Sequence, residues 1–208
     1  MLDIFLPAFV MLFVTVDPVS IIPIFVSLTL GATRAQKIRM ALMGCLIATV
    51  LLVLFGLFGQ ALLDNFGITL PAFRVAGGVL LFLIALEMLF SRRNERKSKS
   101  AEEIHDRVEP EDISAFPLAI PLLCGPGAIA SIMLLTADQA GNPLGVGIVL
   151  GAGASVMLIG AVLLVLAARF EHFIPQAVSN VITRLLGMLL AALAVQFMFD
   201  GLRAGFLG

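Results

Sequence analysis

A carboxylate followed by a proline lies in the middle of an apolar segment, in the run Asp17-Pro-Val-Ser-Ile-Ile-Pro. A charge inside a membrane-spanning helix is costly and usually functional. Each proline removes a backbone N–H and clashes with the carbonyl four residues back, and the freed carbonyls need partners unless they line a cavity. We predict a discontinuous helix whose unwound centre binds a small polar solute through Asp17, Pro18, Ser20 and Pro23. The alternative is a merely kinked helix in which Asp17 bonds to a neighbouring helix.

A second interruption, Gly125-Pro126-Gly127, lies inside another long apolar segment. Glycine adopts any φ, and this triplet cannot continue a regular helix. Where a helix restarts after such a break, its first N–H groups are free and favour an anion. Interrupted segments at matching positions in two halves indicate a transporter's binding site. We therefore assign Gly125, Pro126, Gly127 and Ser131 to the same site, with a structural Gly-Pro kink as the alternative.

Further polar residues lie in or beside the apolar segments. Gln196 is deep enough either to bond across helices or to line a cavity, and we include it among the candidate substrate-binding residues. Arg74 and Arg184 open their segments, so both can extend to the membrane interface. Glu87 lies close to Arg92 and Arg93, which favours a role as an anchor over a role as a proton carrier.

Asp17 has two competing roles. A carrier driven by a proton gradient must load and release a proton in each cycle, and a carboxylate in a low-dielectric site could do this. Alternatively, Asp17 only caps the N–H groups that the break leaves free. The sequence leaves both roles open.

Known catalytic and cofactor motifs are missing from the sequence. The two histidines, His105 and His172, are too far apart to form a metal-ligand pattern, and there is no P-loop, zinc-protease or nucleophile-elbow motif. We therefore expect no enzyme activity, no catalytic residues, no metal and no cofactor. Net charge is −1, so no basic surface favours nucleic acid.

Composition sets the class of protein. Of the 208 residues, 60% are hydrophobic and 13% are charged, whereas soluble domains have about 25% charged residues. A spanning helix needs about 20 apolar residues, and six segments qualify. We predict an all-α polytopic membrane protein with spans at 4–29, 39–63, 71–90, 113–136, 144–168 and 181–206. The lipid bilayer is its expected surroundings, and a homo-oligomer is left open.

Basic residues predict the orientation, because cytoplasmic loops carry an excess of Lys and Arg. Eleven of the thirteen basic residues lie in or beside the connections after the first, third and fifth segments. Those connections are expected in the cytoplasm, with both termini outside.

The chain also shows signs of an internal repeat. A shift of 108 residues places Asp17-Pro18 on Gly125-Pro126, and a shift of 110 places Arg74 on Arg184. Each half has three spans, an odd number, so the halves would be related by an axis in the membrane plane. We predict one transmembrane domain, 1–208, with repeats at 1–90 and 113–208 joined by a solvated cytoplasmic loop at 91–112; a partner-binding helix is the alternative for the loop.

Four stretches carry a resemblance to a known family. They are Asp17-Pro-Val-Ser-Ile-Ile-Pro-Ile-Phe, Arg74-Val-Ala-Gly-Gly, Pro117-Leu-Ala-Ile-Pro-Leu-Leu-Cys-Gly-Pro-Gly-Ala-Ile and Gln196-Phe-Met-Phe-Asp-Gly-Leu-Arg. With them, nearly the whole chain resembles the MarC family of bacterial inner-membrane proteins, which is similar to a broader group of small amino-acid carriers. The resemblance implies an inner-membrane location, no enzyme activity and transport of neutral amino acids such as glycine and alanine. A non-transporting protein that assembles or regulates partners is the other hypothesis.

Overall fold

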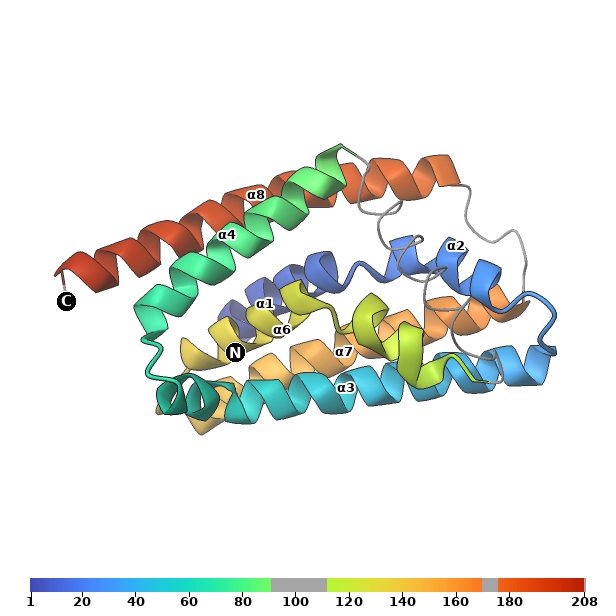
Figure 1. Ribbon diagram of the computed structural model, residues 1–208, viewed down its shortest axis with the longest axis horizontal. Helices are drawn as coiled ribbons and strands as arrows, with labels where there is room; N and C mark the ends of the chain where they lie inside the picture. Colours follow the sequence, from blue (N-terminus) through green and yellow to red (C-terminus); the bar gives the residue numbers. More distant parts are fainter. Residues whose placement is uncertain (91–111, 170–175, 208) are drawn as a thin grey trace.

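The computed structural model describes residues 1–90, 112–169 and 176–207, and within these ranges it contains helices and short turns but no strand (Figure 1). The elements in chain order are α1 (Leu2–Val16), α2 (Pro18–Leu28), α3 (Arg34–Asn65), α4 (Leu70–Leu89), η1 (Ser114–Leu123), α6 (Pro126–Ala137), α7 (Pro143–Arg169) and α8 (Gln176–Leu207). The all-α class predicted from the sequence is confirmed. The predicted loop at 91–112 lies outside the described residues except for Asp112.

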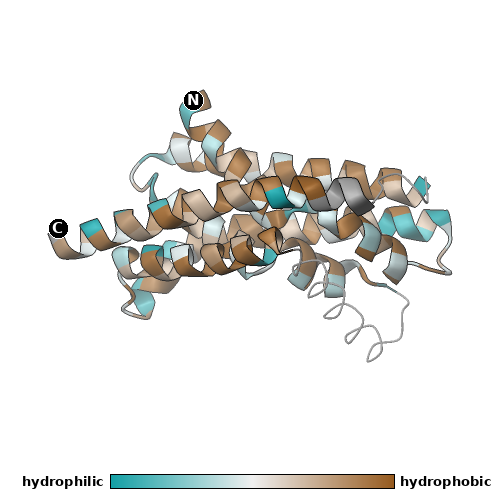
Figure 2. Ribbon diagram, turned by 90° about the horizontal axis from the view of Figure 1, so that it is seen from above, coloured by the Kyte–Doolittle hydropathy of each residue, from teal (hydrophilic) through white to brown (hydrophobic). Residues whose placement is uncertain are grey.

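The predicted spans match the helices closely. In the described part of the chain, five helical stretches are long and apolar enough to cross a membrane, or six if η1 and α6, which bend by 63° at their junction, form one span. Figure 2 shows hydrophobic residues along the helices and hydrophilic ones chiefly at their ends. The largest differences lie at two helix starts, since α3 begins at Arg34 rather than 39 and α8 at Gln176 rather than 181. Arg184 therefore lies within a helix instead of at its start.

Local sequence signals set where the helices begin. Thr33 and Gln36 form a reciprocal capping box at the start of α3, with the Thr33 N–H donating to Gln36 Oε1 at 2.9 Å. Thr69 caps α4 by accepting from the Ala72 N–H, and Asn142 caps α7 by accepting from the Gly145 N–H. Such caps satisfy N–H groups that have no partner within the helix.

The helices form three layers (Figure 1). The middle layer holds the two interrupted segments, α1–α2 and η1–α6, which contact each other. On one side lie α3 and α7, and on the other side lies the pair α4–α8. The broken segments are therefore enclosed between two layers of continuous helices.

Two hydrophobic clusters divide the interior. The larger cluster joins the middle layer to α3 and α7. The smaller one joins α4 and α8 to Met11 and Val14 of α1. The middle layer therefore shares more of its core with α3 and α7 than with α4 and α8.

Several helix contacts join the two halves of the chain. Corresponding helices pair with each other, α3 with α7 and α4 with α8, and the contact of α1 with α7 has its counterpart in that of η1 with α3. The symmetry axis in the membrane plane stays a prediction.

Candidate substrate site at two helix breaks

The first break lies at Asp17, between α1 and α2. Asp17 has a left-handed backbone, φ 52° and ψ 63°, whereas a helix requires negative values of both. Its N–H still closes the last turn of α1 by donating to the Phe13 carbonyl at 2.9 Å. Pro18 then opens α2 at a position where its missing N–H leaves no intrahelical bond unmade. The discontinuous helix predicted from Asp17-Pro18 is what the structure contains.

The second break lies at Cys124 and Gly125, between η1 and α6. Cys124 has φ −102° and ψ 63°, and Gly125 is extended at φ −78° and ψ 171°. Pro126 is the first residue of α6, as Pro18 is of α2. Gly125 carries no side chain that could cap α6, but its carbonyl accepts from the Ala128 N–H at 3.0 Å. Pro126 has no N–H, so the Gly127 N–H is the one in the first turn without an acceptor within the helix.

Two glycines of α7 show that the breaks lie at a common depth. A Cβ atom added to Gly160 would lie 3.5 Å from Pro18, and one added to Gly153 would lie 3.6 Å from both Leu12 and Ile132. The two glycines are seven residues apart, about 10 Å along α7. The helix between Leu12 and the first break has a similar length, and so has the helix between the second break and Ile132. Figure 1 shows both breaks at the same level along the bundle.

Polar groups buried near the breaks lack partners. Asp17 and Ser131 are both 0% exposed. Among the described residues, neither carboxylate oxygen of Asp17 nor the hydroxyl of Ser131 has a hydrogen-bond partner. Asp17 does not cap α2 either, since its side chain makes no bond to that helix. Ionised carboxylates buried alone cost several kcal/mol, so this group needs a proton or a cationic partner.

Thr183 of α8 is a site residue that the sequence analysis missed. Its hydroxyl is 2.9 Å from that of Ser20, in the first turn of α2, and both side chains are buried. Nothing in the sequence around Thr183 distinguishes it from an ordinary helical threonine. An inverted-repeat alignment would not find it either, because the contact joins different halves of the chain.

The remaining predicted residues lie in different surroundings. Pro18 and Gly127 are buried at the breaks, Gly125 and Pro23 are half-buried, and Pro126 is exposed. Gln196 is not brought to the breaks. It lies on an exposed part of α8 and donates to Asp200 at 3.0 Å.

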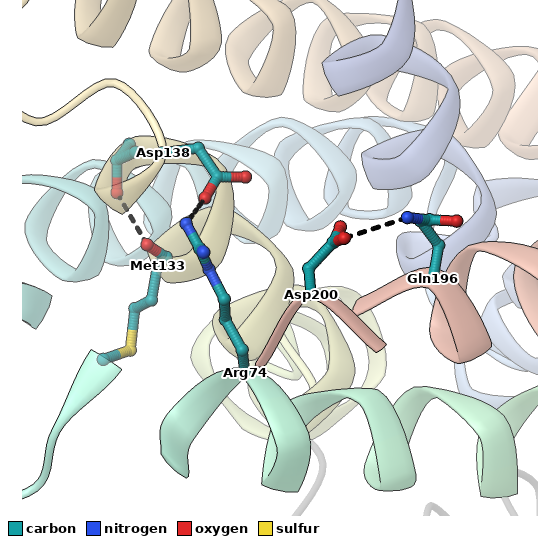
Figure 3. A network of polar contacts seen from close by, with 6 residues as sticks. Arg74, Met133, Asp138, Gln196 and Asp200 are labelled. Atoms are coloured by element: carbon teal, nitrogen blue, oxygen red, sulfur yellow. Dashed lines mark hydrogen bonds and ion pairs between the residues drawn. The ribbon is translucent and has the colours of Figure 1, made fainter. Parts of the chain in front are cut away.

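Arg74 has a partner that the sequence analysis did not identify. It forms an ion pair with Asp138, at the end of α6, near Asp200 and Gln196 (Figure 3). Burial raises the pKa of Asp138, the Arg74 charge and hydrogen bond lower it, and Asp200 raises it further, with a net rise. This pair ties the start of α4 to the end of the second broken segment.

A cavity of about 390 Å³ lies between α4 and the start of α6. Pro126 lines it on the α6 side, while Glu87 and apolar side chains of α4 line the rest. The cavity therefore reaches the second break from the side of the α4–α8 layer. Within the described residues, no three His, Cys, Asp or Glu side chains gather as metal ligands.

Comparison with known proteins agrees with these features. The model of a family described as "MarC family integral membrane protein" matches residues 2–206. The chain belongs to the MarC family. The matched range includes both breaks, Thr183 and the Arg74–Asp138 pair, so the whole candidate site lies within the part of the chain that defines the family.

Similar proteins occur in archaea and bacteria. The chain is 40% identical to "UPF0056 membrane protein MJ0972" of Methanocaldococcus jannaschii over 97% of its length and 87% of the relative. It is 34% identical to "UPF0056 membrane protein YvbG" of Bacillus subtilis, over 95% and 93%. It is 33% identical to "UPF0056 membrane protein YhcE" of Escherichia coli, over 96% and 92%. No solved structure matches the chain.

Proposed function

We propose that this MarC-family protein is a secondary carrier of small polar solutes, and in particular of neutral amino acids. The observation that carries the proposal is the buried, unpartnered Asp17 carboxylate at a helix break that faces a second break. Interrupted helices at the centre of a membrane bundle are where secondary carriers bind solute. An ionisable group there, without a structural partner, is a functional-site hypothesis in its own right.

The charges at the breaks suit a zwitterion. The Gly127 N–H at the start of α6 has no acceptor within the helix, and a helix N-terminus favours a carboxylate. Asp17, when ionised, favours an ammonium group. Ser131 adds a hydroxyl without a partner of its own. A neutral amino acid carries both charges on adjacent groups.

Asp17 is also our candidate for proton coupling. When protonated, it no longer needs a cationic partner, so it can stay buried in the empty carrier. When ionised, it binds the ammonium group of the solute. Protonation and solute binding would then exclude each other at one carboxylate, so protons and solute would move in opposite directions and an outward proton gradient would drive uptake.

The location proposed for the carrier is the bacterial inner membrane. Both termini would lie outside, because the basic residues at the start of α3 favour the cytoplasmic side. The Arg74–Asp138 pair would then lie at the outer end of the bundle.

Solute counterflow tests the proposal without any assumption about coupling. Purified protein is reconstituted in liposomes loaded with unlabelled alanine, and entry of external labelled alanine is measured. We expect transient accumulation well above that of protein-free liposomes. Entry equal to that of protein-free liposomes, for alanine, glycine and serine alike, would favour the non-transporting alternative.

A further inference from the structure

The pair α4–α8 is joined through its backbones. A Cβ atom added to Gly78 of α4 would lie 2.8 Å from the Ala194 carbonyl oxygen of α8. One added to Gly201 of α8 would lie 2.9 Å from the Pro71 carbonyl oxygen of α4. Side chains cannot fit at these positions, so the two backbones are in direct contact over several turns. Close packing of this kind holds membrane helices together.

The same pair meets the rest of the bundle differently. It packs on α1, α2 and α6, the broken segments, rather than on α3 and α7. It has its own hydrophobic cluster, and the cavity of about 390 Å³ lies at this boundary. The pair therefore meets the broken helices through a core that is separate from the cluster joining those helices to α3 and α7.

Polar contacts that cross the boundary include an ion pair and a hydrogen bond. Arg74 pairs with Asp138 at one end, where both side chains are partly exposed. Ser20 and Thr183 form the other contact, which is wholly buried and sits beside the first break. A single hydrogen bond contributes little net stability, so this one can break and re-form within a transport cycle.

We infer that α4 and α8 move as one unit against the broken helices, and that Thr183 is the positioning residue that links this movement to the site through Ser20. In the observed position, the bond holds the first turn of α2 to α8. When the unit moves, the bond breaks, and the first turn of α2 is released beside Asp17. This inference rests on the proposed function for its purpose, but the movement itself can be measured without any solute.

Distances between spin labels test the movement. Cys45 and Cys124 are first replaced by alanine, and labels are placed at exposed positions. One pair, Leu46→Cys on α3 with Leu185→Cys on α8, reports the unit against the bundle. The other pair, Leu83→Cys on α4 with Leu185→Cys, reports the unit's own geometry. Both are measured in lipid nanodiscs, with Thr183 intact and with Thr183→Val.

Thr183→Val should shift or broaden the α3–α8 distances by about 2 Å or more, the scale of helix movements in switching proteins. The α4–α8 distances should stay unchanged, and Thr183→Ser should restore the wild-type distribution. Ser20→Ala removes the same hydrogen bond from the other side and should reproduce the shift. A shift seen in both variants would not be explained by misfolding of one of them. Thr136→Val is the matched control, because the Thr136 hydroxyl bonds only to carbonyls of its own helix.

Three results would overturn the inference: unchanged α3–α8 distances in both Thr183→Val and Ser20→Ala, equal changes in the two label pairs, or an equal shift in Thr136→Val. Adding alanine is a separate arm. If alanine leaves all distances unchanged and is not transported, the proposed function fails while the result on the movement stands.

Discussion

At the scale of single residues, Asp17 is the group on which the proposed mechanism depends. Its position in the chain was predictable, because a carboxylate directly before a proline in an apolar run is typical of a functional break in a spanning helix. Its burial and its lack of partners were not, since they depend on how α1, α2 and α6 pack. Thr183 was missed for the same reason: its partner Ser20 is 163 residues away.

Asp17→Asn separates coupling from capping. The amide nearly preserves the shape of the side chain but cannot carry the proton. We expect uptake driven by a proton gradient to be abolished, while alanine counterflow persists at a higher alanine concentration, because the amide oxygen still accepts a hydrogen bond from the ammonium group but carries no charge. A role limited to capping would leave the pH profile of transport unaltered and reduce the free energy of unfolding by about 1 kcal/mol or less.

Asp138 should give the protein a distinctive response to acid. Its pKa is raised above the ordinary 3.8, mainly by burial and also by Asp200, despite Arg74. The folded state therefore binds this proton more readily than the unfolded state does. The group's contribution to the free energy of unfolding is largest at low pH, falls as the pH rises from 3.8 through the raised value, and is constant above it.

Replacing Asp138 by asparagine should remove that part of the pH dependence. Denaturant unfolding of wild type and Asp138→Asn, compared over the acidic range, measures the difference. Asp64 is a carboxylate near the end of α3, and Asp64→Asn serves as the control. If the free energy of unfolding changed with pH in the same way in wild type and Asp138→Asn, the raised pKa of Asp138 would be contradicted.

At the scale of elements, the sequence predicted the helices and both breaks well. Hydropathy and the Gly and Pro residues specify a span and its interruption directly. The rotation of each helix was not predictable, because helices that are apolar all round carry little information about which face meets a neighbour. This is why Gln196, assigned to the site, lies on an exposed part of α8 with Asp200 as its partner.

Glycine substitutions test the α4–α8 pairing. Gly78→Ala places a methyl group against the Ala194 carbonyl oxygen, so we expect a loss of about 1–3 kcal/mol in the free energy of unfolding from overpacking. Gly151→Ala is the matched control, because nothing lies within 4 Å of the added atom. It should raise stability by about 0.5–1 kcal/mol, the ordinary gain of alanine over glycine in a helix. Equal effects of the two substitutions would mean that α4 and α8 are not in close contact.

At the scale of the whole molecule, the layered arrangement gives each part a role. The layer of α3 and α7 shares a core with the broken helices, while the pair α4–α8 meets them through a separate, smaller cluster. Neither the layers nor this difference was visible in the sequence, since both arise from contacts between distant segments.

Orientation in the membrane can be checked by labelling. In a background without native cysteines, Ala35→Cys at the start of α3 should react with an impermeant thiol reagent only from the cytoplasmic side. Ala140→Cys, in the turn between α6 and α7, should react only from outside. Both positions are exposed, so a failure to label would not come from burial. The reverse pattern would refute the orientation drawn from the basic residues.

Gradient-driven uptake of labelled alanine into proteoliposomes tests the central claim most directly, because it requires both a solute site at the breaks and a proton site at Asp17. With an outward proton gradient, the wild-type protein should accumulate alanine above the external concentration, and a protonophore should abolish the accumulation. Asp17→Asn should fail to accumulate it, while Gly151→Ala should behave as wild type. Accumulation by Asp17→Asn equal to wild type, or none by wild type under any gradient, would contradict a proton-coupled carrier centred on Asp17.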